Sequence, residues 1–273
     1  MNLPFLKRVL HGAIVPLVAL AIWQALSTFG WINPHILPSP VAVIRKWFEY
    51  IAPMEAYQPD SGNYLLWLIS GELPHDAWAS LSRVLGGFAI GAGLALPLGL
   101  LMGANQAIYK LFDPLVQILR PIPPIAYIPL AILWFGLGNP PAFFLISIGS
   151  FFPVLMNTIA GVRQVDGIYI RAARNLGASQ MTMFRRVILP AATPYILAGA
   201  RIGMGTAFIV VIVAEMIAVN NGLGFRILEA REYFWSDKII AGMFTIGFFG
   251  LAIDIAMNAL NNHLLQWHRG LEH

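Results

Sequence analysis

Four arginines gather in one polar segment, residues 166–190, which separates two long apolar segments. They are Arg171, Arg174, Arg185 and Arg186. Guanidinium groups bind carboxylates and phosphates through directed hydrogen bonds, so a cationic, alanine-containing helix in this segment is typical of a docking element. The sequence contains no Gly-x-x-x-x-Gly-Lys-Ser/Thr phosphate loop, so we expect any ATP chemistry to reside in another chain.

Ionisable residues also occur inside the apolar segments, where a charge at membrane depth indicates function by default. Arg201 and Glu215 are fourteen positions apart (215 − 201), about 21 Å along one helix, so they cannot pair with each other. Glu215 is expected near the outer end of its span, in a structural role or at a wetted gate. Arg201 could hold an anion or join neighbouring helices, and Asp254 should be paired inside the bundle. Arg83 is expected to snorkel or to cap a helix.

The composition is that of a membrane protein. Of the 273 residues, 58% are hydrophobic and 11% are charged, against roughly 25% charged in an ordinary soluble domain. Segments long enough to cross the bilayer as helices, without β-barrel alternation, predict an all-α bundle. The chain has no cysteine, its six histidines do not cluster, and we expect no metal site. The net charge of +4 is better explained by membrane topology than by nucleic acid binding.

We expect six transmembrane helices and, after the first, a helix lying in the membrane interface over residues 38–52, with Trp47 and Tyr50 at the lipid headgroups. The predicted division is 1–79, holding the first span, this interfacial helix and an outer loop, and 80–273, holding the core. The six expected spans cover residues 12–31, 83–104, about 111–138, 141–162, 193–218 and 238–265.

Two spans have unusual compositions. The second carries six glycines, which allow close helix approach in lipid. The third contains Arg120-Pro121-Ile122-Pro123-Pro124-Ile125-Ala126-Tyr127-Ile128-Pro129. Each proline removes a backbone donor, so this span must be broken and must lie inside protein or line a cavity.

The polar segment itself should hold two short helices. The first covers about 165–176 and is stopped by Gly177. The second begins with Ser179 as its N-cap and ends at Pro190. Thr193 and Pro194 should then open the fifth span.

The spacing Arg171-Ala172-Ala173, three residues, Gly177, nine residues, Val187-Ile188-Leu189-Pro190 resembles the EAA loop of ABC-importer permeases. Arg171 and Val187 depart from the usual Glu and Ile. The proline run resembles the Pro-x-Pro-x-Ala-x-x-Pro-Leu segment of permeases for nitrate, bicarbonate, taurine and alkanesulfonates. Residues 220–234 and 267–270 look most similar to the cyanobacterial-type nitrate permease subunit.

This resemblance implies a type I ABC importer permease fold with a cytoplasmic coupling helix in the loop 163–193. It implies a non-enzymatic membrane subunit that binds no cofactor itself, because ATP and Mg²⁺ bind to partners. The implied partners are a second permease copy, two ABC ATPase subunits and an extra-cytoplasmic binding protein. The residues implied for ATPase coupling are Arg171, Ala172, Ala173, Arg174, Gly177, Leu189 and Pro190. For the translocation pathway the candidates are Arg120, Pro123, Pro124, Arg201 and Glu215.

Within that family, nitrate or nitrite is the first expected substrate, with bicarbonate and then taurine or alkanesulfonate as alternatives. With the N-terminus placed inside, the inner segments hold ten Lys and Arg residues and the outer ones five. The positive-inside rule therefore predicts that both termini are cytoplasmic, and the resemblance implies a multi-pass protein of the bacterial inner membrane. A proton- or sodium-coupled secondary carrier using Glu215 and Asp254 is the alternative from another class, and a non-transporting scaffold is a third.

Overall fold

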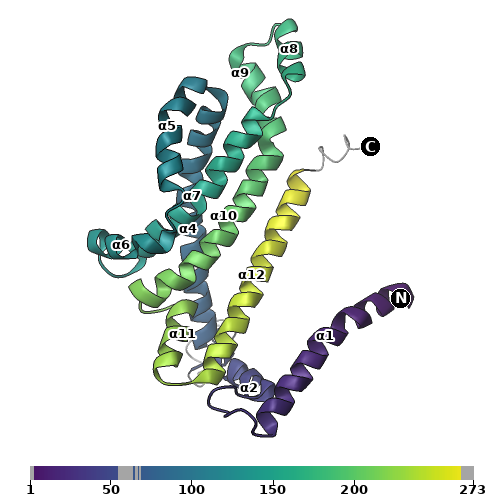
Figure 1. The fold of residues 1–273 in the computed structure, drawn as a ribbon, viewed down its shortest axis with the longest axis vertical. Coiled ribbons are helices and arrows are strands. Elements are labelled where there is room, and N and C mark those ends of the chain that lie inside the picture. Colours follow the sequence, from purple (N-terminus) through teal and green to yellow (C-terminus); the bar gives the residue numbers. More distant parts are fainter. Residues whose placement is uncertain (1–2, 55–63, 65–66, 68, 266–273) are drawn as a thin grey trace. The chain divides into compact units, whose positions relative to one another are not determined.

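The computed structural model of the chain describes residues 3–54, 64, 67 and 69–265, with side chains from residue 14 onward. This described part is mostly helical, without a named strand. The predicted tail 266–273, most of the outer loop and the side chains of Lys7 and Arg8 lie outside it. The helices are α1 Leu3–Thr28, α2 Pro40–Ile51, α4 Glu72–Ala104, α5 Gln106–Leu119, α6 Ile128–Phe135, α7 Asn139–Arg163, α8 Gly167–Asn175, α9 Gln180–Met183, α10 Leu189–Ala218, α11 Leu223–Glu232 and α12 Ser236–Leu264 (Figure 1).

Among the described residues, four helices are long and apolar enough to cross a membrane: α4, α7, the continuous helix Gln180–Ala218 and α12. The pair formed by α5 and the segment Pro124–Phe135 passes the same test as a single bent span. The predicted first span corresponds to α1, whose part with described side chains, Ile14–Thr28, is apolar. The all-α membrane architecture predicted from composition is confirmed.

The chain forms two compact units, one made of Met1–Ala77 with Arg226–Gly247 and the other of Trp78–Phe225 with Phe248–His273. We call them unit 1 and unit 2. Helices α4, α11 and α12 each run from one unit into the other. The domain boundary that the sequence predicts, between residues 79 and 80, stays a prediction.

Unit 1 contains a network of charges around Arg226. Its guanidinium lies 2.6 Å from Asp76 Oδ2 and 2.7 Å from Glu72 Oε1. The Tyr50 hydroxyl donates to Asp76 at 3.1 Å. Burial, reinforced by the Asp76 and Glu72 carboxylates, raises the pKa of Tyr50, so this hydroxyl stays protonated and keeps donating.

This network explains two boundary corrections. Residues 72–76 were expected in the outer loop, but α4 begins at Glu72 because its two acidic residues are neutralised by Arg226 and can remain helical. Tyr50 was expected at the lipid headgroups, but it is buried against Asp76. Helix α2 lies within the predicted range 38–52, with Ser39 as its N-cap and Pro40 in its first turn.

Unit 2 is built on α7, which packs along α10 (Figure 1). Helix α4 meets α7 through its glycines. A Cβ at Gly91 would lie 2.4 Å from the Ser147 carbonyl oxygen, and one at Gly103 would lie 2.6 Å from Val162 Cβ. Any larger residue would push the helices apart, so the predicted close approach is confirmed. Val116 of α5 joins the buried cluster that α4 and α7 form.

The third span is broken where the prolines predicted. After α5 the chain makes a short 3₁₀ turn, Pro124–Tyr127, and continues as α6 at 84° to α5. Pro124 and Pro129 lie in the first turns of these two segments, where a missing N–H costs nothing. The irregular backbone is thus confined to about four residues, 120–123.

Candidate functional site

The polar segment with the four arginines forms a helical loop between α7 and α10. Asp166 caps α8 by accepting from the Ile168 N–H at 2.8 Å. The helix ends at Gly177, whose φ of +77° is the left-handed conformation predicted for it. The Gly177 N–H bonds to the Arg174 carbonyl at 2.9 Å, and the Ala178 N–H bonds to the Ala173 carbonyl at 3.0 Å. This pair of bonds is the Schellman C-cap, which closes α8 with a fixed turn.

The second helical piece differs from its prediction. Ser179 caps α9 as expected, accepting from the Thr182 N–H at 3.2 Å. Pro190 was expected to end the helix and Thr193 to cap the next one. Instead the π-helical stretch Phe184–Ile188 leads directly into α10. Pro190 therefore lies inside a continuous helix, where it removes one backbone donor, and the π-helical stretch before it is the local adjustment that accommodates it. The Thr193 hydroxyl donates to the Leu189 carbonyl at 2.8 Å.

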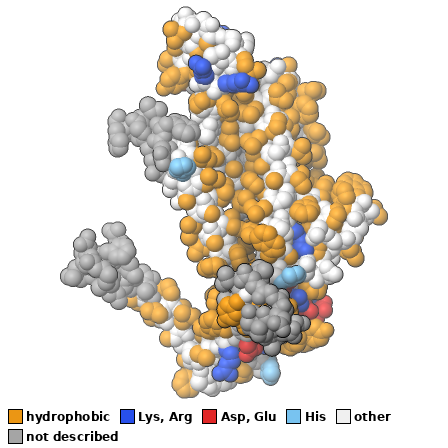
Figure 2. Space-filling model, turned by 180° about the vertical axis from the view of Figure 1, so that it is seen from behind, with side chains coloured by type: hydrophobic (Ala, Val, Ile, Leu, Met, Phe, Trp, Pro, Cys, Tyr) orange, Lys and Arg blue, Asp and Glu red, His pale blue; other side chains and the backbone are white. Residues whose placement is uncertain are grey.

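The loop presents an exposed surface of mixed character, which we call the docking face. Its exposed side chains include Arg171, Arg174, Ile168, Tyr169 and Leu176, the last 88% exposed. Ala173 and Met183 point inward and are buried. Figure 2 shows Lys and Arg side chains at the end of unit 2 that carries α8 and α9. Of the other predicted coupling residues, Ala172, Gly177 and Pro190 are exposed and Leu189 is half-buried.

Glu215 lies in a buried polar cluster that the sequence did not reveal. It is fully buried and pairs with Arg83, itself 4% exposed, at 2.6 Å between Oε1 and Nη1. The other carboxylate oxygen accepts from the Ser80 hydroxyl at 2.8 Å and from the Gly224 N–H at 3.0 Å. Arg83 therefore neither snorkels nor caps a helix, and Glu215 is not wetted here. Its role in the pathway stays a prediction.

The same cluster fixes the turn after α10. Arg83 donates to the Asn221 carbonyl at 3.0 Å and to the Asn139 side chain at 2.7 Å. Gly222, with φ of +106°, places its backbone against the Glu215 carboxylate, and a Cβ there would lie 2.5 Å from Cδ. Only glycine fits this position, because both the backbone angle and the space exclude a side chain.

Arg201 and Asp254 form a bidentate ion pair between α10 and α12. The Nε and Nη2 atoms of Arg201 each lie 2.8 Å from one oxygen of Asp254. The prediction that Asp254 is paired is confirmed, but its expected place inside the bundle is not what the structure shows. The side chains are 42% and 52% exposed. Because a charged pair in a span avoids lipid, this face of α10 and α12 must meet water or another protein.

Arg120 is exposed at the end of α5, directly before the break in the third span. Its guanidinium has no ion pair or hydrogen bond in the described part of the chain. Pro123 is exposed and Pro124 is half-buried. The five pathway candidates thus separate into three places in unit 2: the break, the Arg201 pair and the buried Glu215 cluster.

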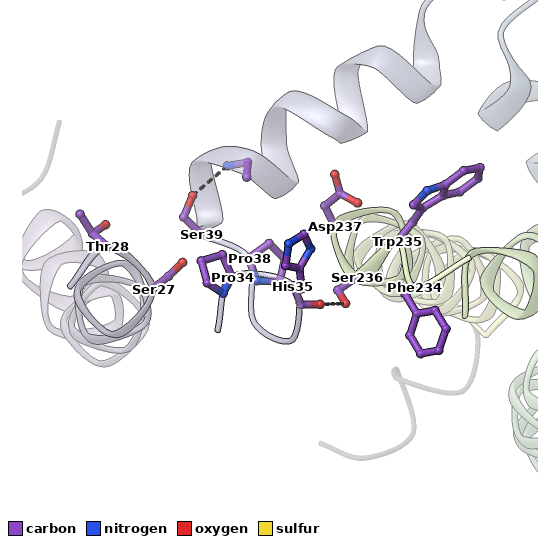
Figure 3. A pocket seen from close by; sticks show the side chains of 11 residues that line it. Ser27, Thr28, Pro34, His35, Pro38, Ser39, Phe234, Trp235, Ser236 and Asp237 are labelled. Carbon is purple, nitrogen blue, oxygen red and sulfur yellow. Dashed lines mark hydrogen bonds between the residues drawn. The ribbon is translucent and has the colours of Figure 1, made fainter. Parts of the chain in front are cut away.

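Unit 1 holds a pocket of about 530 Å³ that no sequence pattern pointed to. It lies where the turn after α1 meets the start of α12, with Phe234 and Trp235 on one side and Ser27 and Thr28 on the other (Figure 3). The Ser236 hydroxyl donates to the His35 carbonyl. The described residues contain no group of three or more His, Cys, Asp or Glu side chains that could hold a metal ion.

Comparison with known proteins agrees with this geometry. Residues 95–269 match the family model "Binding-protein-dependent transport system inner membrane component". The chain is 40% identical to a probable ABC transporter permease protein of Brucella melitensis, over 92% of this chain and 94% of the relative. It is 34% identical to the taurine transport system permease protein of Escherichia coli, over 92% and 87%. Identity to the nitrate import permease protein of Synechocystis is 33%, over 90% and 86%.

A solved structure with the same fold is the inward-facing methionine ABC transporter MetNI. One of its chains superposes with a TM-score of 0.62 at 20% identity, covering 70% of this chain and 94% of that one. At this identity the similarity concerns the fold alone. The predicted type I importer architecture is therefore confirmed.

Proposed function

Because this chain belongs to the family of binding-protein-dependent transport system inner membrane components, the permease subunits of ABC transporters, we propose that it carries a small oxyanion into the cell. Nitrate or nitrite is the first substrate to test. Bicarbonate and taurine or alkanesulfonate are the alternatives. Membership implies an ATPase and a substrate-binding protein as partners, and the permease itself is a non-enzymatic membrane component.

The substrate class rests on shared chemistry. Relatives named for nitrate and for taurine are similar to this chain to nearly the same degree, 33% and 34% identical. Nitrate and the sulfonate group of taurine are both compact oxyanions. Two arginines of unit 2, Arg120 and Arg201, are exposed along the spans. Such cations lower the energy of an anion in a low-dielectric path without enclosing it, and Arg120 does so more than Arg201, whose charge is balanced by Asp254.

For the mechanism, we propose that the docking face binds the ATPase subunits and that two permease copies form the pathway. Because the helix from Gln180 to Ala218 is continuous, a movement of α9 transmits directly to α10. The Schellman turn at Gly177 would keep α8 at a fixed angle to α9 during this movement. The coupling residues and both cytoplasmic termini are part of this proposal.

The secondary-carrier alternative needs a carboxylate that exchanges protons or sodium. Both candidate carboxylates of the spans are ion-paired, Glu215 with Arg83 and Asp254 with Arg201. The ATP-driven importer is therefore the function that the family and the geometry support together.

The first experiment is purification of the tagged chain from its native membrane in mild detergent, with mass spectrometry of the proteins that accompany it. We expect an ABC ATPase in the complex. After reconstitution with the binding protein, the rate of ATP hydrolysis should rise several-fold when the transported oxyanion is added. The same concentration of chloride should leave the rate unchanged. A chain that purifies alone and takes up substrate on a proton gradient would contradict the proposal.

Exchanging the charges of Arg201 and Asp254 separates a pathway role from a structural one. Arg201→Gln should lower oxyanion transport by roughly tenfold, because the anion loses a charged donor. The double variant Arg201→Asp with Asp254→Arg restores the ion pair but moves the cation to α12. If Arg201 contacts the anion, transport measured in vesicles stays low in the double variant. Full recovery would show that the pair only joins the helices.

A further inference from the structure

Helix α5 carries a polar stripe along one face, although together with Pro124–Phe135 it is long and apolar enough to form one bent membrane span. Its polar members recur at intervals of four, four and three residues, which places them on one side of a helix. They are Tyr109, Asp113, Gln117 and Arg120. The Gln117 amide donates to Asp113 at 2.7 Å. The opposite side of α5 is exposed and apolar, and it consists of Leu111, Leu115 and Ile118.

The stripe extends deep into unit 2 from the end that carries the docking loop. At the start of α5, the Arg163 guanidinium at the end of α7 lies 3.5 Å from the centre of the Tyr109 ring. Further along, Met156 of α7 lines the same groove as Gln117 and Arg120. Tyr109 and Arg120 are eleven positions apart (120 − 109), which is about 16 Å along the helix, roughly half of the hydrocarbon thickness.

The groove along this stripe has a volume of about 470 Å³ and is lined by the four polar residues together with Val116, Pro121 and Met156. At this depth lipid cannot cover a carboxylate and a guanidinium without a large cost. Directly beyond Arg120, the non-helical backbone of residues 121–123 likewise needs protein or water around it. Pro121 of this non-helical segment lines the same groove as the stripe, so both features need water or protein on one side of the broken span.

We propose that the polar stripe of α5 forms the water-filled wall of the translocation pathway between the docking-loop end and the break, with Arg120 as its deepest cation. The inference rests on the proposed importer function and specifies which surface an oxyanion passes. Arg120 is without an ionic partner in the described part of the chain, so it can attract an anion at the break. Asp113, which accepts a hydrogen bond from Gln117, places a negative charge nearer the docking-loop end. The stripe is therefore not positively charged along its whole length, so the anion is not bound too tightly to leave.

The chain contains no cysteine, so each introduced cysteine is the only thiol of this subunit, and its labelling is measured on the separated subunit. In membranes containing the complete complex, Asp113→Cys, Gln117→Cys and Arg120→Cys would be treated with methanethiosulfonate ethylsulfonate, a water-soluble anionic thiol reagent. The matched controls are Leu111→Cys, Leu115→Cys and Ile118→Cys. Because only hydrated cysteine forms the reactive thiolate, the stripe positions should react at least about tenfold faster than the controls. Co-purification of the ATPase shows that each variant is assembled.

Several results would overturn the proposal. Equal rates on both faces would mean that α5 lies on the membrane surface. Unreactive stripe positions that instead form disulfides between two permease copies under oxidation would make the stripe a dry dimer contact. Transport measured on the unmodified complex tests the oxyanion substrate separately from the role of the α5 stripe. If the stripe positions react but the complex carries no oxyanion, the substrate class is wrong and the stripe still lines the pathway.

Discussion

Replacing Glu215 with leucine is expected to be among the most destabilising single changes in unit 2. The substitution leaves the Arg83 guanidinium buried without a counter-charge, and it removes the acceptor for Ser80 and for the Gly224 N–H. Breaking one side of a buried ion pair costs about 3–5 kcal/mol. The thermal unfolding midpoint of the purified complex in detergent should fall accordingly, and the yield of folded protein with it.

Two further variants show that the cost comes from the uncompensated charge. Glu215→Leu combined with Arg83→Met removes both charges and should recover part of the lost stability. Recovery should be incomplete, since the Gly224 N–H and the Ser80 hydroxyl still lack their acceptor. Glu49→Gln is the surface control: its exposed pair with Lys46 should contribute less than about 0.5 kcal/mol. If Glu215→Leu melted like Glu49→Gln, the buried network would not hold the turn after α10.

The sequence predicted those parts of the fold that depend on local chemistry. Proline removes a backbone donor wherever it stands, so the break in the third span could be placed at residues 120–129 and lies there. Gly177 and Ser179 were assigned to a helix end and a helix start, and each has the geometry expected of its type. Such residues affect the backbone only within one or two helical turns, so their effects can be predicted from the neighbouring sequence alone.

Pairing over long distances was not predictable in the same way. Arg83 and Glu215 are separated by 132 positions and no periodicity connects them. Because the sequence shows no partner for either residue, Glu215 was expected in a structural role or at a wetted gate, and Arg83 was expected to snorkel or to cap a helix. The Arg201–Asp254 pair was anticipated only as a need for some partner of Asp254. The structure supplies the partner because α10 and α12 come together there.

The error at Pro190 changes the mechanical interpretation. A proline inside a helix removes one backbone donor and normally ends the helix. Here the π-helical stretch Phe184–Ile188 adjusts the backbone directly before Pro190, so the helix continues through it. The docking loop is consequently not hinged at Pro190. It is continuous with α10, and its one defined turn lies at Gly177.

Replacing Gly177 with valine is expected to uncouple the ATPase while leaving the bundle folded. The φ of +77° is unfavourable for a residue with a Cβ by about 1–2 kcal/mol, and more so for a β-branched one. A Cβ at this position would meet no atom within 4 Å, so the penalty is purely one of backbone conformation. The chain can relieve it by opening the Schellman turn, which frees α8 and moves Leu176 away from its place on the docking face. A penalty of this size corresponds to roughly a five- to thirtyfold loss of the docked arrangement.

The measurement is the amount of ATPase that co-purifies with each variant, together with substrate-stimulated ATP hydrolysis. Gly177→Asn is the matched control, because asparagine adopts the left-handed conformation at low cost, and it should retain most of the binding. Gly93→Ala, at a helical glycine whose Cβ would also meet open space, tests whether any added side chain is harmful. If the Gly177→Val complex bound as much ATPase as the unmodified chain and showed full substrate-stimulated hydrolysis, the angle between α8 and α9 would not be needed to pass the movement of the ATPase subunits to the permease. The lever would then consist of the continuous helix from Gln180 alone.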